Sequence, residues 1–198
     1  MFTNMKKSKA SDIAILSLLV ALIIVIQFLS SYVYQVWPIP VQPTLASIPV
    51  IVGACILGWR KGAILGFFMG LILFVQASMT AGPTNFLFTP VYPVPGTHSG
   101  SFWAIIITFV PRILIGVFAG LVYKIGKSRV TAGIAGFVGA ITNTIFVLGF
   151  MYLFFGTVLK MTFGQLLGMI IAGNSIVEVI AAVILTAAIV PALEKNRH

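Results

Sequence analysis

Six long apolar stretches, separated by segments that carry almost all of the charge, constrain this chain more than any other feature. They lie at roughly residues 12–30, 44–58, 61–79, 102–123, 129–155 and 163–191. A helix of about 20 apolar residues crosses the hydrocarbon core of a bilayer. The pattern therefore predicts an all-α integral membrane protein with six transmembrane helices, forming a single domain over residues 1–198. Composition agrees, since only 8% of the residues are charged, against about 25% in soluble domains.

Two of the six stretches allow an interpretation other than a full transmembrane helix. The second is short for a full span, so we expect a tilted or partly re-entrant helix, or one that begins near Pro43, because proline is accepted in a first helical turn. The first follows Lys6, Lys7 and Lys9 as a signal peptide would. Its apolar core is longer than a signal peptide needs and no small-residue cleavage motif follows it, so we expect a retained helix.

The basic residues predict the orientation, because short cytoplasmic connections are enriched in Lys and Arg. With the N-terminus inside, ten of the twelve basic residues fall on the cytoplasmic side and only Lys160 falls outside. Arg112 belongs to neither side. The sequence thus predicts that both termini are cytoplasmic, and that the net charge of +9 orients the chain in the lipid bilayer rather than binding nucleic acid.

The two outer connections, residues 31–43 and 80–101, contain no Lys, Arg, Asp or Glu and hold most of the prolines. The second also carries Phe86, Phe88 and Tyr92. A long connection of this composition favours an ordered lid over the outer mouth of the bundle. An aromatic segment at the membrane interface is the alternative.

Small residues recur at intervals of four, and such spacing lets helix backbones approach closely. Gly62, Gly66 and Gly70 follow one another in the third stretch, and Gly116 and Gly120 in the fourth, where we expect internal packing. The first stretch has its own series, which is a candidate surface for another subunit: Ala14, Ser17 and Ala21.

Polar residues inside the apolar stretches are the strongest functional signal. The fourth stretch contains FVPRILIG, in which Arg112 stands about ten residues, or roughly 15 Å, from the outer end of its helix. An Arg at the centre of a span costs roughly 2.5–3.5 kcal/mol on insertion scales. Glu178 and Asn143 stand at a similar depth. Arg112 and Glu178 form either a structural ion pair or part of a cavity for a polar, anionic ligand, with Asn143 and Asn174 as further hydrogen-bonding groups.

Catalytic motifs are missing from the sequence. It has no phosphate-binding loop, no assembled nucleophile–base set and no metal cluster, and its one cysteine, Cys55, lies in an apolar stretch. We therefore expect no enzyme, no metal and no cofactor. Two classes remain: a solute carrier that works alone, and a substrate-binding subunit energised by partners. The small size and the lack of an internal repeat favour the second, and a requirement for an ATPase would distinguish them.

Five strings, in this order and spacing, resemble one family: SDIAILSLLVAL, IPVQPTLASIPVIVGACILGWRKGAILG, FVPRILIGVFAGLVYKI, ITNTIFVLGFMY and GNSIVEVI. They are similar to the six-helix S components, the substrate-binding subunits of energy-coupling factor (ECF) vitamin transporters. With FLFTPVYP before the fourth stretch, the combination is most similar to the pantothenate-specific type. S components for hydroxymethylpyrimidine, riboflavin or folate remain alternatives.

The resemblance implies a multi-pass protein of the bacterial cell membrane that captures a vitamin outside. Such a subunit docks on a transmembrane T component through small residues of its first helix, here Ala14, Ser17 and Ala21, and topples to release the vitamin inward. Two partner ATPases consume ATP, so no cofactor is expected in this chain.

We place the expected ligand site in the outward halves of helices four to six, closed by the two outer connections. The polar anchors would be Arg112, Asn143, Asn174 and Glu178. The apolar wall would be Phe86, Phe88, Tyr92 and Trp103, with Gln76 and Gln42 as contacts at the rim.

Overall fold

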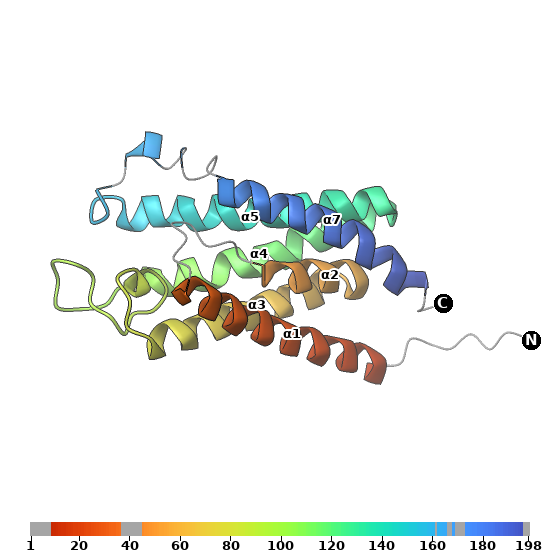
Figure 1. The fold of residues 1–198 in the computed structure, drawn as a ribbon, viewed down its shortest axis with the longest axis horizontal. Coiled ribbons are helices and arrows are strands. Elements are labelled where there is room, and N and C mark those ends of the chain that lie inside the picture. The colour runs from red at the N-terminus through yellow and green to blue at the C-terminus, as the bar shows by residue number, and fades with distance from the viewer. Residues whose placement is uncertain (1–8, 37–44, 161, 166–167, 169–172, 196–198) are drawn as a thin grey trace, which may run out of the picture.

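A computed structural model of the chain forms a bundle of helices that run roughly side by side (Figure 1). It describes residues 9–36, 45–160, 162–165, 168 and 173–195. Five helices are long and apolar enough to cross a membrane. They are α1 (Lys9–Val36), α3 (Trp59–Met79), α4 (Trp103–Gly126), α5 (Arg129–Phe155) and α7 (Gly173–Lys195). The prediction of an all-α membrane protein is confirmed.

A shorter helix, α2 (Ser47–Leu57), occupies the centre of the bundle and contacts all five long helices. Its 11 residues span only about 16 Å, about half of a bilayer core. Every residue from Ser47 to Cys55 is buried. A helix that is apolar on all sides is stable only when it is enclosed in this way. Gly58, with φ at 91°, then reverses the chain into α3, a conformation that glycine adopts without strain.

The last apolar stretch differs from its predicted bounds. We expected one helix over 163–191. The long helix described is Gly173–Lys195, and residues 163–165 are also helical, whereas residues 166–167 and 169–172 lie outside the described chain. The first helix is longer than the predicted 12–30, with bounds Lys9–Val36.

The glycine series pack helix backbones against each other inside the bundle, as predicted. A Cβ atom added to Gly66 of α3 would lie 2.0 Å from the carbonyl oxygen of Arg112 in α4. A Cβ added to Gly116 would lie 2.0 Å from the carbonyl oxygen of Gly62. Only glycine allows these approaches, so the α3–α4 contact fixes the position of the Arg112 backbone.

The two ends of the bundle differ. The start of α1 and the end of α7 lie at one end, which we call the tail end, and the 80–101 connection lies at the other, which we call the loop end (Figure 1). This connection is ordered: it contains a short 3-10 helix, Asn85–Leu87, and buries Phe86, Leu87 and Val94 against α4 and α5. Its predicted order is confirmed, and its role as a lid stays a prediction.

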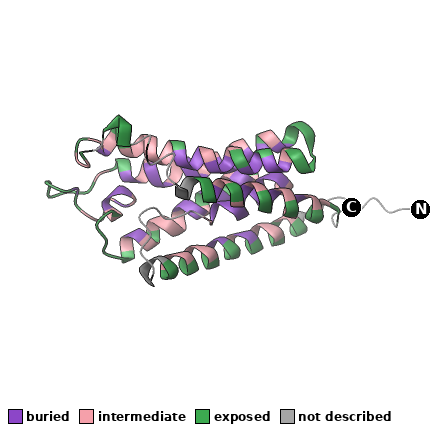
Figure 2. Cartoon of the chain, turned by 45° about the horizontal axis from the view of Figure 1, so that its top comes forward, coloured by how far each residue is buried: buried purple, intermediate pink, exposed green. Residues whose placement is uncertain are grey.

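Helix α1 is the least enclosed of the long helices. It packs on α2 and α3, and only 11% of its most apolar window is buried. Exposed residues follow it along most of its length (Figure 2). Near the tail end the carboxylate of Asp12 forms an ion pair with Lys61 of α3. One side of α1 is therefore open to lipid or to another protein.

Candidate ligand-binding site

Proline and arginine in FVPRILIG act together in the structure. Pro111 has no N–H, so the carbonyl of Ile107, four residues earlier, loses its usual helical partner. The neighbouring guanidinium replaces that partner, since Nη1 of Arg112 donates to the Ile107 oxygen at 2.7 Å. Arg112 is only 4% exposed, and its Cζ atom lies 5.7 Å from the centre of the Phe88 ring. The proline therefore creates a carbonyl acceptor that holds the buried arginine side chain in place.

A contact between three helices, one helical turn further from the loop end, shows which residues lie at the level of Arg112. There a Cβ added to Gly139 of α5 would lie 2.7 Å from Ile51 of α2 and 3.5 Å from Ile115 of α4. One turn nearer the loop end, on the same faces of these three helices, stand three polar residues: Ser47, Arg112 and Asn143. All three are buried, so they converge on the middle of the bundle.

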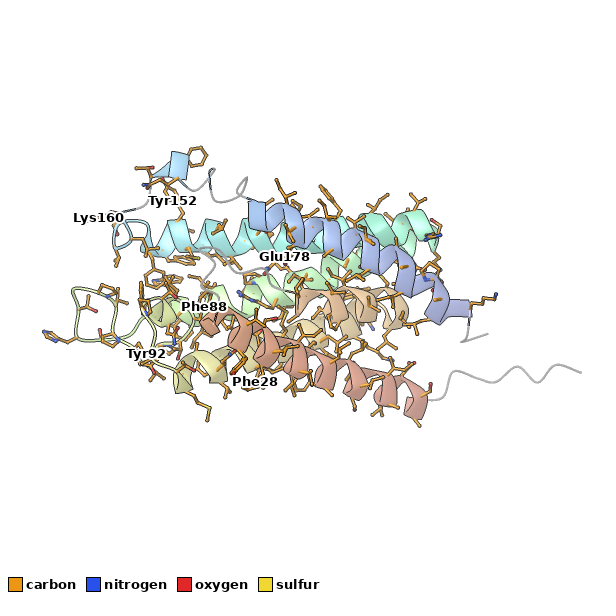
Figure 3. The ribbon with its side chains drawn as sticks, in the orientation of Figure 1. Phe28, Phe88, Tyr92, Tyr152, Lys160 and Glu178 are labelled. Atoms are coloured by element: carbon orange, nitrogen blue, oxygen red, sulfur yellow. The ribbon has the colours of Figure 1, made fainter. Side chains whose placement is uncertain are left out.

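Helix α7 adds a fourth polar side chain to this level. Glu178 is 5% exposed and accepts a hydrogen bond from Ser47 Oγ at 3.2 Å. It lies about midway along the bundle (Figure 3). We call this set the polar layer: Ser47, Arg112, Asn143 and Glu178.

Two atoms of the polar layer are buried without a partner among the described residues: Nε of Arg112 and Oδ1 of Asn143. One is a hydrogen-bond donor and the other an acceptor. Leaving such a group unpaired costs about 1–3 kcal/mol, and more when it is charged. Native proteins rarely accept this cost without a water molecule or a ligand to satisfy the atoms. A molecule with both an anionic oxygen and a hydroxyl or N–H group would satisfy both atoms.

The relation between the two buried charges differs from a simple ion pair between neighbouring helices. Both α4 and α7 pack on α5 and on α2, which separate them. Arg112 and Glu178 do attract each other electrostatically. The hydrogen bonds described for them, however, go to Ile107 and to Ser47. Of the two charges, only Glu178 is hydrogen-bonded to the central helix α2 in the bonds described.

A cavity of about 370 Å³ opens at the loop end between α1, α3 and the 80–101 connection. Its polar lining includes Gln27, Ser31, Gln76 and Asn85. Gln27 donates to Oε1 of Gln76 at 3.0 Å, and Gln76 in turn donates to the hydroxyl of Ser31. The volume is within the usual range for small-molecule sites. Phe88 also lines this cavity, and the centre of its ring lies 5.7 Å from Cζ of Arg112, so one residue contacts both regions.

The structure brings some of the predicted wall residues to this region and places others elsewhere. Phe88 lines the cavity, as does the predicted rim residue Gln76. Phe86 is buried against Phe155 at 5.6 Å between ring centres, within the core of the connection. Trp103 stacks on Phe154 at 4.2 Å and remains 47% exposed.

The three remaining predicted residues do not line the described part of the cavity. The Tyr92 hydroxyl donates to the carbonyl oxygen of Ser78 at 3.4 Å, which ties the connection to the end of α3 (Figure 3). Gln42 lies outside the described residues. Asn174 belongs to α7, but its side chain lies outside the described part of the chain.

Several polar residues of this region were not predicted from the sequence: Gln27, Ser31, Ser47 and Asn85. A signal existed for the first two, because Gln27 and Ser31 stand four apart on one face of an otherwise apolar helix. Ser47 gave no such signal, since a serine beside the start of a helix is usually read as a cap.

The series predicted for docking is exposed on α1. Ala14, Ser17 and Ala21 are all exposed, and the large residues Leu18 and Leu22 beside them are 69% and 45% exposed. Within the described chain no other helix covers this face. The surface is therefore free to contact another membrane helix.

The structure defines an all-α membrane protein with a buried donor–acceptor layer and a polar cavity at one end. The chain matches the family described as ECF transporter, substrate-specific component, over residues 11–194. It therefore belongs to that family, whose members are transporter components rather than enzymes, and the resemblance found in the sequence is confirmed.

Two curated relatives support the assignment. The chain is 56% identical to the pantothenic acid transporter PanT of Lactococcus lactis over 194 residues, which cover 98% of this chain and 99% of the relative. It is 32% identical to the pantothenate transporter PanT of Leuconostoc mesenteroides over 164 residues, covering 75% and 73% of the two chains.

Proposed function

We propose that this chain captures pantothenate at the loop end of the bundle and delivers it across the membrane as a subunit of an ECF transporter. The observation that carries the proposal is the pair of unpartnered buried atoms in the polar layer, Arg112 Nε and Asn143 Oδ1. Pantothenate has a carboxylate, an amide and two hydroxyl groups. Its carboxylate matches the Arg112 donor, and its amide N–H or a hydroxyl matches the Asn143 acceptor.

The names of the two relatives support the choice of vitamin, since both are described as transporters of pantothenate. The cavity supports it chemically, because the amide and hydroxyl side chains of Gln27, Ser31 and Gln76 suit a neutral, hydroxylated ligand portion. A movement of Phe88, which lines this cavity and lies beside Arg112, would join the two parts into one site.

We further propose six membrane-spanning or membrane-embedded helices with both termini in the cytoplasm. The exposed basic residues Arg60, Lys124, Lys127 and Arg129 flank the connections at the tail end, where positively charged connections favour the cytoplasm. The loop end, with its uncharged 80–101 connection, then faces the outside and receives the vitamin.

Energy for release would come from partners: a T component that contacts the exposed face of α1 at Ala14, Ser17 and Ala21, and two ATPases. The low burial of α1 supports this role, since a stripe of small residues on an uncovered helix allows close approach of another helix. The uncharged 80–101 connection supports toppling, because tipping the bundle would otherwise carry charged side chains into hydrocarbon.

Uptake of labelled pantothenate by cells that lack their own pantothenate carrier tests the proposal. We expect uptake when the chain is produced with a T component and its ATPases, and loss of uptake when the ATPases are inactivated. Competition with unlabelled riboflavin, folate and hydroxymethylpyrimidine should leave uptake unchanged. Uptake by the chain alone would contradict the proposal and indicate a carrier that works without partners.

A further inference from the structure

A second hollow lies on the outer surface of the bundle, near the tail end and away from the polar layer. It has a volume of about 460 Å³ and runs between α5 and α7. We call it the α5–α7 groove. Its lining is apolar apart from one basic residue, and includes Arg129, Gly133, Ile134, Phe137, Val183 and Ala187.

Small residues make the floor of the groove. A Cβ added to Gly133 would lie 3.6 Å from both the Ala187 Cβ and the Val183 Cγ1, in ordinary contact. Glycine is therefore not required there for close helix packing, unlike Gly66. The groove walls are large residues that remain open, with Ile134 47% and Phe137 48% exposed. Something apolar must fill such a hollow in a bilayer, because an empty one forfeits dispersion contacts.

The charge at one end of the groove indicates what fills it. Arg129 is exposed at the first residue of α5, and the exposed Lys124 and Lys127 precede it. Within the described chain Arg129 forms no ion pair. The start of a helix carries a partial positive charge, which adds to that of the side chain. From Arg129 to Phe137 the groove extends about 12 Å along α5, enough for the upper part of one acyl chain.

We propose that the α5–α7 groove binds an anionic phospholipid of the leaflet at the tail end. The phosphate group contacts Arg129, at the level where a helix leaves the hydrocarbon, and one acyl chain lies along Gly133 and Val183 between the walls of the groove. The site is separate from the polar layer and does not depend on which vitamin the protein binds.

Native mass spectrometry tests this site. The full chain in detergent is titrated with phosphatidylglycerol or with zwitterionic phosphatidylcholine. The wild-type chain should bind phosphatidylglycerol more tightly. Arg129→Gln should weaken phosphatidylglycerol binding about fivefold, as expected for one basic residue beside an anionic headgroup, and leave phosphatidylcholine unchanged. Gly133→Leu, which places a side chain in the groove, should weaken the binding of both lipids.

Two variants provide matched controls. Arg60→Gln removes an exposed arginine from α3, at the same end of the bundle and outside the groove. Gly149→Leu adds the same side chain to α5, at a position where an added Cβ meets nothing within 4 Å. Neither should change lipid binding. All variants should keep the pantothenate affinity of the wild type.

Three results would overturn the proposal. Equal losses with Arg129→Gln and Arg60→Gln would mean a diffuse charge effect. Unchanged lipid binding in Gly133→Leu would mean that the groove does not hold the acyl chain. Self-association of the wild-type chain that Gly133→Leu abolishes would assign the groove to a protein helix instead of a lipid.

Discussion

Replacing Gly66 with alanine should be among the most damaging single-methyl changes in the bundle. The added Cβ would lie 2.0 Å from the carbonyl oxygen of Arg112, whereas real Cβ atoms essentially never come closer than 3.0 Å to such an atom. The backbone of α4 would have to retreat by about 1 Å, because a carbonyl cannot rotate away as a side chain can. Since that carbonyl belongs to Arg112, the displacement would also disturb the polar layer.

The magnitude follows from the cost of overpacking. Overpacking of a core costs about 1–3 kcal/mol, and a contact between two backbones belongs in the upper half of that range. For a chain of this size, 1 kcal/mol shifts the Tm by about 2–4 °C, so Gly66→Ala should lower the Tm by roughly 4–12 °C. Pantothenate affinity should fall in parallel.

Scanning fluorimetry and calorimetric titration on the same preparations measure both effects, and two other glycines give a graded comparison. Gly70→Ala should cost less, since its Cβ would lie 3.0 Å from the Thr108 carbonyl oxygen. Gly149→Ala, in open space, should be neutral or stabilise α5 by up to about 1 kcal/mol. A Gly66→Ala variant as stable as Gly149→Ala would refute the close contact between α3 and α4.

Two further predictions concern the site and the docking face. Pro111→Ala restores an N–H that can bond to the Ile107 carbonyl. The variant should therefore release the Arg112 guanidinium and weaken pantothenate binding without lowering the Tm. Unchanged affinity in a titration would show that the carbonyl does not position the arginine. Ser17→Trp obstructs an exposed stripe of small residues. It should leave pantothenate affinity intact, but block pantothenate uptake and prevent the T component from co-purifying with the chain. Normal uptake would place the docking surface elsewhere.

The sequence predicted features that depend on one helix at a time. Charges concentrated at the ends of the apolar stretches located the long helices, and the shortness of the second stretch correctly marked α2 as unusual. Gly62 and Gly66 were correctly assigned to internal packing, since glycines four apart lie on one face of a helix whatever the neighbour is.

Features that depend on which helices are neighbours could not be predicted. Ser47, whose hydroxyl donates a hydrogen bond to Glu178, is 131 residues away from it in the chain, and only the central position of α2 brings the two together. The cavity beside Gln27 and Gln76 requires α1 to cross α3 at the loop end, which no periodicity specifies. The bond from Arg112 to Ile107 is local, yet it became evident only when the direction of the side chain was known.

Calorimetric titration with pantothenate tests the central claim most directly. It compares the purified wild-type chain with Asn143→Ala, Arg112→Gln and the control Arg60→Gln. We predict that Arg112→Gln loses roughly thirtyfold or more in affinity, as expected when one partner of a buried charge-assisted pair is removed. Asn143→Ala should also bind more weakly while keeping its Tm, because the Oδ1 atom it removes has no partner within the described chain. Arg60→Gln should bind like the wild type. The account would be contradicted if both polar-layer variants bound pantothenate with wild-type affinity and lost only thermal stability. That result would show that the polar layer only holds the fold together.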